Sequence, residues 1–285
     1  MAAQLLQGAP IASAIKDDLL PAIQRLTNSG IALSLAAVQV GENPASAVYV
    51  RQQQKNCEQI GIHYRLHELP ADTTQDDLAD YLQRLNANPA VTGIILQMPL
   101  PEGMDIRVVR SLLAPVKDVE GISPANMGSV VYGRPRLAPC TALAVMELIG
   151  ATGIPLRGKQ VTVVGHSDIV GKPVALLLLD QFATVSVCHI GTAERGDLAD
   201  YVARAEILVV AVGRAGVIKG EWVRPGAVVI DVGINRVGDK LVGDVEFEPA
   251  AERAAYITPV PGGVGPLTVA MLLRNTVEAA RWQRE

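Results

Sequence analysis

The sequence has 285 residues, of which 49% are hydrophobic, 19% are charged and 4% are aromatic, and its formal net charge is -4. This length allows two domains with cores of their own. The acidic balance argues against a protein that binds nucleic acid, and no apolar run reaches the roughly 18 residues of a membrane-spanning helix. Because aromatic residues are scarce, the cores must be built from Ala, Val, Leu and Ile, which suits parallel sheets covered by helices.

The cysteines and the first residues indicate a reducing compartment. Cys57, Cys140 and Cys188 are far apart and form no CxxC pair, so neither a disulfide framework nor a metal site is expected. Cys57 and Cys140 are expected to be buried packing residues. The first twenty residues lack the basic and apolar segments of a signal peptide. The spacing of Ile11 and Leu19 instead indicates an amphipathic helix, and we expect a cytoplasmic protein.

Strand and helix patterns alternate in the first half of the chain. We predict strands over residues 33–40, 62–68 and 91–97, and helices over 46–60 and after Thr74, where Asp77 completes a capping box. In the second strand His63, Arg65 and His67 share one face, which is expected to be solvated.

The second half repeats the alternation from about Leu156. We predict strands over 161–164, 184–188, 207–212 and 228–232, and helices over 174–180 and 267–282. This order predicts an α/β fold with parallel sheets in two domains. We predict that residues 1–140 form an N-terminal α/β domain, that the C-terminal helix (267–285) returns to it and completes it, and that residues 141–266 form a second α/β domain.

Glycine turns follow three strands of this second domain. Gly165 ends a strand just before a helix, Gly171 allows that helix to pack closely, and Ser167 can donate to a phosphate. Further turns occur at Gly213 and at Gly233, which precedes Ile234. The spacing is not GxGxxG, so a plain strand-to-helix turn is the alternative, but three such turns favour a nucleotide crevice.

Two polar residues stand where apolar ones are expected, and a third polar residue of interest lies in a loop. Gln53 lies about 40° from Tyr49 on the helical wheel, inside the apolar stripe, whereas Lys55 lies at about 240°, on the far side. Gln53 is therefore either a satisfied core glutamine or a ligand-binding residue. Gln97 ends a strand, where α/β sheets bind ligands. Glu120 lies in a loop and is either a solvated acid or part of a site.

Seven ordered motifs lie along the whole chain: GENPASAVYV (41–50), ILQMPLPEG (95–103), KDVEGISPANMG (117–128), APCT (138–141), VVGHSDIVGKP (163–173), IKGEWVRPGAVVIDVGIN (218–235) and ITPVPGGVGPLT (257–268). Together they resemble the bifunctional methylenetetrahydrofolate dehydrogenase/cyclohydrolase family. The resemblance implies a folate-binding catalytic domain, a Rossmann domain that binds NADP, a folate cleft between them, and a homodimer.

The resemblance also implies roles for single residues. It places Tyr49 against the pterin, makes Gln97 a partner of the catalytic residue at position 53, and includes Glu120 among the catalytic residues. Leu100, Pro261 and Gly265 are implied to lie along the folate. Gly165, His166, Ser167, Ile190, Gly213 and Ile234 are implied to contact the dinucleotide.

This chain departs from the family pattern at four positions. The lysine of Tyr-x-x-x-Lys is Gln53, and DVDG is DVEG, with Glu120 as its acid. The arginine of GRS is His166, and the serine after Cys-His is Ile190. The last two positions are those expected to hold the 2′-phosphate of NADP, so NAD is a possible cofactor as well.

The glutamine at position 53 bears on the mechanism. Hydride transfer needs mainly alignment of two bound molecules, which Gln53 can still support. Hydrolytic ring opening needs proton movement, which glutamine cannot supply near neutral pH, and such help contributes roughly 10²–10⁴-fold. We hypothesise that ring opening is weakened or lost, unless another group such as Glu120 replaces the lysine. Two further alternatives are a silent folate- or nucleotide-binding regulator and a dehydrogenase of another small metabolite.

Overall fold

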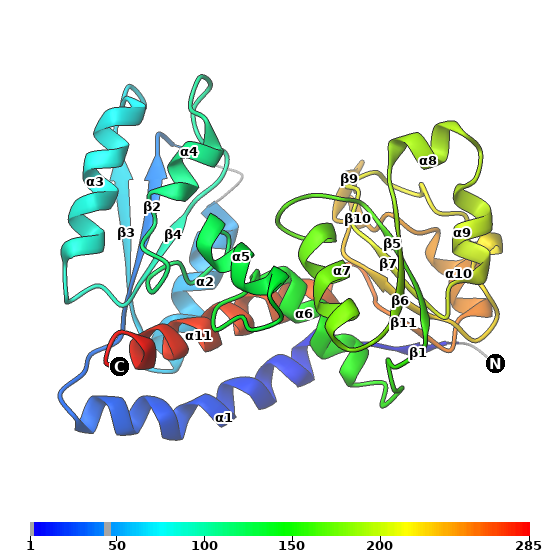
Figure 1. Ribbon diagram of the computed structural model, residues 1–285, viewed down its shortest axis with the longest axis horizontal. Coiled ribbons are helices and arrows are strands. Elements are labelled where there is room, and N and C mark those ends of the chain that lie inside the picture. The colour runs from blue at the N-terminus through cyan, green and yellow to red at the C-terminus, as the bar shows by residue number, and fades with distance from the viewer. Residues whose placement is uncertain (1–2, 43–46) are drawn as a thin grey trace. The chain divides into compact units, whose positions relative to one another are not determined.

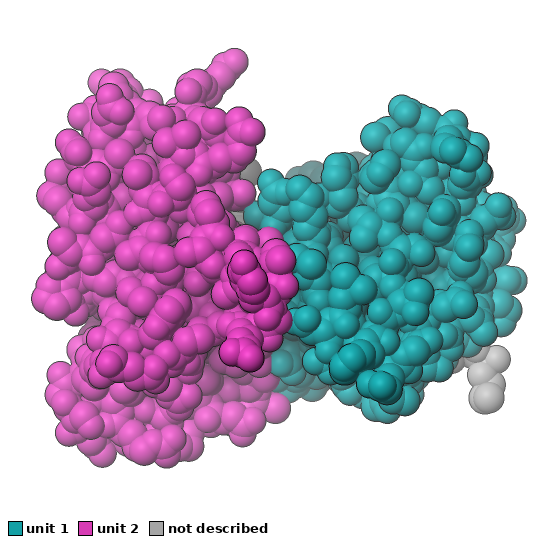
Figure 2. Space-filling model, viewed as in Figure 1, with its two compact units in different colours: residues 1–13, 141–268 teal, residues 14–140, 269–285 magenta. Residues whose placement is uncertain are grey.

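The computed structural model describes residues 3–42 and 47–285. The chain divides into two compact units, drawn in teal and magenta in Figure 2. Unit 1 holds the residues up to Ser13 together with Thr141–Thr268, and unit 2 holds Ala14–Cys140 and Val269–Glu285. The residues up to Ser13 therefore belong to unit 1 and not to the N-terminal domain of the prediction. The reason is that Gln4 and Leu5 pair with Tyr256 and Ile257 in the sheet of unit 1.

Unit 2 is built on a parallel three-stranded sheet of order β3-β2-β4. Its elements include β2 (Ser34–Val40), α2 (Ala47–Gln59), β3 (His63–Leu69), α3 (Gln75–Ala87), β4 (Gly93–Leu96), α4 (Ile106–Ser111) and α5 (Pro124–Val131). The predicted strands and the helix α2 are confirmed within about two residues; the expected start of that helix at Ser46 lies outside the described residues. Thr74 caps α3 with Asp77 as predicted.

The core of unit 2 comes from alternate strand residues and one face of α3. Ala36 and Val38 of β2 and Ile94 of β4 pack against Leu78 and Leu82 of α3, and all five side chains are buried. Burial of such side chains drives the pairing of helix and sheet, at roughly 25 cal/mol for each Å² of apolar surface. This burial holds α3 against the three-stranded sheet, and the carboxyl ends of its strands carry the site described below.

Unit 1 contains a parallel six-stranded sheet of order β1-β11-β8-β7-β5-β6. Figure 1 shows the order of its helices and strands. They are β1 (Gln4–Leu5), β5 (Gln160–Val164), α7 (Gly171–Asp180), β6 (Thr184–Cys188), α8 (Ile190–Glu194), α9 (Leu198–Arg204), β7 (Ile207–Val210), η1 (Gly220–Trp222), β8 (Val228–Asp231), β9 (Asn235–Val237), β10 (Lys240–Val242), α10 (Phe247–Arg253) and β11 (Tyr256–Ile257). β9 and β10 form a separate antiparallel pair.

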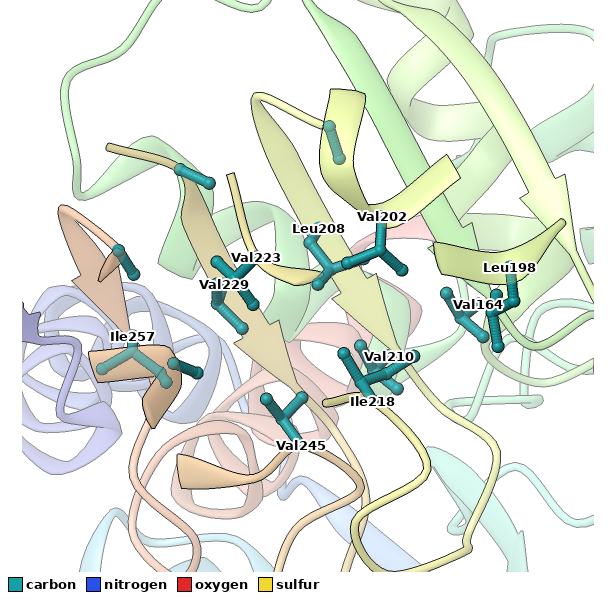
Figure 3. Close-up of a cluster of buried hydrophobic side chains, with 14 of the residues drawn as sticks. Val164, Leu198, Val202, Leu208, Val210, Ile218, Val223, Val229, Val245 and Ile257 are labelled. Carbon is teal, nitrogen blue, oxygen red and sulfur yellow. The ribbon is translucent and has the colours of Figure 1, made fainter. Parts of the chain in front are cut away.

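The order in which strands are added to this sheet reverses at β5. From β5 the chain passes to β6 on one side, then crosses back to β7 on the other. Such a switch point leaves a crevice at the carboxyl ends of the strands. The sheet and α9 enclose a buried apolar cluster, in which Val164, Leu208 and Val210 of the strands meet Leu198 and Val202 of the helix (Figure 3).

Three helices include residues of both units: α1 (Gly8–Asn28), α6 (Cys140–Gly150) and α11 (Val264–Trp282). The predicted two-domain α/β fold is confirmed. In the part of the chain that the structure describes, no helix is both long and apolar enough to cross a membrane. All three cysteines are free and buried.

Candidate active site

Gln53 faces the interior of unit 2, as the helical spacing predicts. Its side chain is only 1% exposed, whereas Lys55 is exposed. The Gln53 Oε1 accepts hydrogen bonds from Gln97 Nε2 at 2.8 Å and from the Tyr64 hydroxyl at 3.1 Å. These two bonds use both lone pairs of the amide oxygen, so Gln53 is a buried residue whose side-chain oxygen is fully engaged.

Gln97 reaches Gln53 because it directly follows β4. Its backbone N–H continues the sheet by donating to the Val38 carbonyl at 2.8 Å, and its side chain is buried. Tyr64, on β3, was not predicted as a site residue. The alternation of that strand places Tyr64 opposite the solvated His63, and a half-buried phenol needs a polar partner; that signal could have identified it.

Tyr49 joins the same group from the first turn of α2. The residue keeps 43% of its surface exposed, while its hydroxyl hydrogen bonds with Gln53. Desolvation, and then the nearby Glu120 carboxyl, raise the pKa of the Tyr49 hydroxyl well above its ordinary value. We call Tyr49, Gln53, Tyr64 and Gln97 the Gln53 cluster. Gln53 and Gln97 form the buried, hydrogen-bonded end of this cluster, and Tyr49 forms the end that reaches the surface.

Glu120 lies at the same edge of the sheet. The segment before it runs alongside β4, with an isolated bridge between Ile94 and Asp118, and the Leu96 N–H donates to Glu120 Oε2 at 3.3 Å. Glu120 is half-buried. Desolvation and the neighbouring Asp118 raise the pKa of Glu120 to about 7, against smaller opposing effects of the Leu96 N–H and Arg110. It is therefore not the solvated acid of the alternative interpretation.

The hydroxyl and thiol groups near Glu120 hold their protons. Burial raises the pKa of the Tyr64 hydroxyl and of the Cys140 thiol, and the Glu120 carboxyl adds to both effects. Cys57 and Cys140 are buried as predicted, and burial also raises the pKa of Cys57 to about 12. At neutral pH these groups are proton donors, not bases.

The expectation for His67 was wrong in part. His63 and Arg65 are exposed, but His67 is half-buried and its Nδ1 lies 2.6 Å from the Tyr81 hydroxyl. The helix α3 packs over this end of β3 and covers the imidazole. Burial lowers the pKa of His67.

Unit 1 has a pocket of about 720 Å³ at its switch point. The residues that follow β5, β6 and β7 line it, among them Gly165, His166, Ser167, His189, Ile190 and Val212. The predicted crevice is thus present. Gly213 and Ile234 do not line it: Gly213 lies between the lining residues Val212 and Arg214, and Ile234 is 60% exposed.

Two glycines bring the backbone close around this pocket. A Cβ on Gly165 would lie 2.3 Å from the Ala211 carbonyl oxygen, and Gly165 has φ +117°. A Cβ on Gly171 would lie 2.0 Å from the Gly165 carbonyl oxygen. Neither position therefore accepts a side chain. Because α7 begins close to the end of β5, its first N–H groups can bind a phosphate in the pocket. The Ser167 Oγ accepts from the Val170 N–H at 3.2 Å, which leaves its hydroxyl hydrogen to donate.

Asp244 supports the pocket and was missed by the sequence analysis. Its carboxylate is fully buried and accepts from the backbone N–H groups of Val212, Gly213 and Arg214 at 2.7, 2.9 and 2.9 Å. The Asn235 side chain donates a fourth bond at 2.8 Å. One aspartate thus holds both the turn after β7 and the start of β9.

The remaining predicted residues belong neither to the Gln53 cluster nor to the lining of the unit 1 pocket. In unit 2 Leu100 packs against the buried α3 cluster. Pro261 and Gly265 belong to unit 1 and are exposed, with Gly265 in the first turn of α11. Within the described residues, no group of three or more His, Cys, Asp or Glu is placed to hold a metal ion.

Unit 1 has a parallel sheet with a pocket at its switch point, and unit 2 carries ionisable and amide groups at its strand ends. These two features are typical of a nucleotide-dependent enzyme. The family model "Tetrahydrofolate dehydrogenase/cyclohydrolase, catalytic domain" matches residues 6–120, and the model "Tetrahydrofolate dehydrogenase/cyclohydrolase, NAD(P)-binding domain" matches residues 139–284. The chain belongs to the tetrahydrofolate dehydrogenase/cyclohydrolase family.

Close relatives cover the whole chain. It is 51% identical over 282 residues to the "Bifunctional protein FolD" of Moorella thermoacetica. The aligned residues cover 99% of this chain and 100% of that relative. It is similar to the solved FolD structure from Campylobacter jejuni at a TM-score of 0.95 and 42% identity, with 99% and 100% of the two chains covered. The Trypanosoma brucei FolD, complexed with NADP cofactor and inhibitor, matches at a TM-score of 0.95 and 40% identity over 100% and 99% of the chains.

Proposed function

We propose that this protein oxidises 5,10-methylenetetrahydrofolate to the methenyl form with NADP⁺ and then hydrolyses that product to 10-formyltetrahydrofolate. The observation that carries the proposal is the Gln53 cluster with Glu120 beside it, in the region that the family's catalytic domain matches. Burying two glutamines and a tyrosine hydroxyl in one hydrogen-bonded group is costly unless each is satisfied, and a cluster at strand ends is well placed to orient a ring.

The residues of the unit 1 pocket fit a dinucleotide. Gly165 and Gly171 let the start of α7 pack against the end of β5, where its N–H groups can meet a pyrophosphate, and Ser167 lines the same pocket. A dinucleotide held there by these residues would supply the nicotinamide as hydride acceptor. The lining includes Lys172 and Arg214, and its acid, Asp168, pairs with Lys172 at 2.5 Å. Such a lining favours a phosphorylated ribose over a free diol.

The substrate would meet unit 2 through the exposed part of Tyr49. Its ring can stack on the pterin while its hydroxyl stays bonded to Gln53. Because the hydroxyl remains protonated, Tyr49 positions the ring without taking a proton from it. Leu100, Pro261 and Gly265 are proposed to lie along the folate, as the family resemblance implies. On the same ground we propose a cytoplasmic homodimer.

Two glutamines of α2 provide a matched test. Gln53→Leu leaves the Gln97 amide and the Tyr64 hydroxyl without their acceptor, so the Gln53 cluster loses its geometry, and misplacement of this kind costs about 10²-fold in rate. Gln54, exposed on the same helix, is the control, and Gln54→Leu should stay within about twofold. The measurement is reduced cofactor formed from methylenetetrahydrofolate and NADP⁺.

The same assay separates the alternatives. A silent binding protein would retain the folate or the dinucleotide without forming any reduced cofactor, and a dehydrogenase of another metabolite would ignore the folate. Either result from the unchanged protein would end the proposal. Light scattering on the same preparation tests the homodimer.

A further inference from the structure

Ring opening needs a side chain that takes a proton from water and later returns one. Gln53 cannot do this, because an amide does not exchange protons near neutral pH and both lone pairs of its oxygen are already bonded to Gln97 and Tyr64. Gln53 therefore acts as a fixed support in this chain. The proton must be carried by another group at the same edge of the sheet.

The neighbouring hydroxyl and thiol groups do not qualify. The pKa values of Tyr49, Tyr64 and Cys140 are all raised, so each keeps its proton at neutral pH. Cys140 is also tied to its surroundings, since its thiol donates to the Val119 carbonyl at 3.3 Å.

The neighbouring Asp118 is fully buried, and its Oδ2 accepts from the Ser123 N–H at 2.7 Å and from the Asn126 amide at 2.8 Å. Asp118 is therefore committed to holding its own loop, which leaves the carboxyl group of Glu120.

Glu120 is held next to the Gln53 cluster by the backbone. The Leu96 N–H bonds its Oε2, and the next residue, Gln97, donates to Gln53. One bond occupies one of the roughly four lone-pair positions of a carboxylate, so the group can accept a further proton. Among the residues that the structure describes, no basic side chain forms an ion pair with it. The side chain at position 53, a lysine in the family pattern, carries no charge here.

We propose that Glu120 is the proton-transfer group of ring opening in this chain, an inference that rests on the proposed function. The Glu120 carboxylate takes a proton from water as the water oxygen bonds to the methenyl carbon. The resulting acid returns that proton to the pterin nitrogen as the bond between this nitrogen and the carbon breaks. The new hydroxyl then loses its proton to solvent, which leaves the formyl group and one released proton.

This role sets a direction for the pH dependence. The reaction needs the ionised carboxylate, so hydrolysis should rise with pH through the pKa of Glu120, which lies at about 7. The groups that act on Glu120 or respond to it come from every neighbouring element: Asp118 of its own segment, Arg110 of α4, Tyr49 of α2, Tyr64 of β3 and Cys140 of α6. A cationic methenyl substrate stabilises the carboxylate and so lowers the pKa of Glu120 in the complex. The midpoint pH of the rise should therefore be lower in the profile of kcat than in that of kcat/KM.

The experiment measures hydrolysis of methenyltetrahydrofolate against pH, with the buffer rate subtracted. Glu120→Gln should lower kcat by roughly 10²–10⁴-fold and remove the step near neutral pH. Glu120→Asp keeps a carboxyl on a shorter chain and should retain the step at a lower rate. Gln53→Lys in the Glu120→Gln background should recover hydrolysis with the pH profile of an amine. Glu68→Gln, at an exposed glutamate of the same unit, is the charge-matched control.

The outcomes are distinct. Formation of reduced cofactor by the unchanged protein supports the proposed function independently. If that protein forms reduced cofactor but opens the ring no faster than buffer, the chain is a dehydrogenase alone and Glu120 has no such role. If Glu120→Gln hydrolyses with an unaltered rate and pH profile, the assignment is wrong. If the folded protein forms no reduced cofactor, the proposed function itself fails.

Discussion

His166 stands where the family pattern has an arginine. In the unit 1 pocket the centroid of its imidazole ring lies 5.2 Å from that of the His189 ring. An arginine donates bidentate, charge-assisted bonds to a phosphate, each contributing about 1.5–3 kcal/mol. We therefore expect His166→Arg to lower the KM for NADP⁺ about tenfold or more and to leave the KM for NAD⁺ unchanged. Steady-state kinetics with both cofactors measure this.

The control adds the same charge elsewhere. Gln181 is exposed at the end of α7 and does not line the pocket, so Gln181→Arg should have little effect on either cofactor at physiological salt. Equal improvement for NADP⁺ and NAD⁺ in His166→Arg would show that position 166 does not meet the 2′-phosphate.

Single residues were predictable where a polar side chain breaks a regular pattern. Gln53 interrupts the apolar face of a helix, and Gln97 follows an apolar strand, so both were identified from spacing alone. Their mutual hydrogen bond was not predictable, because it joins residues 44 positions apart. The burial of Glu120 was equally hidden, since it depends on a segment lying alongside β4 and not on the residues around it in sequence.

The turn after β7 depends on one buried carboxylate, that of Asp244. In Asp244→Asn the amide nitrogen must replace one of the two oxygens, and each oxygen accepts two of the four hydrogen bonds. Either orientation leaves two buried donors without an acceptor, at about 1–3 kcal/mol for each. We expect a lower unfolding temperature and a KM for the cofactor raised by about tenfold, because Val212 and Arg214 line the pocket.

Asp239→Asn, at an exposed position between β9 and β10, should change neither quantity. Cofactor binding that is unaffected by Asp244→Asn would mean that the turn keeps its shape without this carboxylate. Thermal unfolding and the cofactor titration together distinguish loss of the turn from loss of the whole fold.

Among the strands, length decided what could be predicted, whereas the helix α6 was missed although it has 11 residues. The strands from β2 to β8 and the helices α2, α3, α7 and α11 have enough residues to show a period of 2 or 3.6. β1 and β11 have two residues each, and β9 and β10 have three. Segments this short carry no period, and their pairing depends on the rest of the sheet, so they were missed.

For the whole molecule, composition and alternation were sufficient to predict two α/β domains. They did not predict that the residues up to Ser13 would join unit 1, because β1 reaches its partner β11 only through contacts 252 residues apart, as in the register of Gln4 with Tyr256. α1 then continues into unit 2. A chain that crosses between units at both ends cannot be divided by sequence position alone.

The stability of the whole chain should report the environment of Glu120 without reference to activity. An unfolded glutamate ionises near its ordinary pKa of about 4.3, whereas the folded chain keeps the Glu120 proton up to about pH 7. The folded state therefore binds more protons in this window, so this group's contribution to stability is present at low pH and is lost as pH rises from about 4 to about 7. The Glu120→Gln variant carries no such ionisation.

We accordingly expect Glu120→Gln to unfold a few degrees above the unchanged protein at pH 8, a gain on the order of 1–3 kcal/mol, and to match it near pH 4.5. Asp231, whose pKa burial raises to about 6, contributes with the same sign in both proteins and cancels in the difference. Calorimetry at the two pH values measures it, with Glu68→Gln as the control. A gain that does not depend on pH would show that the Glu120 carboxyl is solvated in the folded chain, and would remove the physical basis for a proton exchanged at neutral pH.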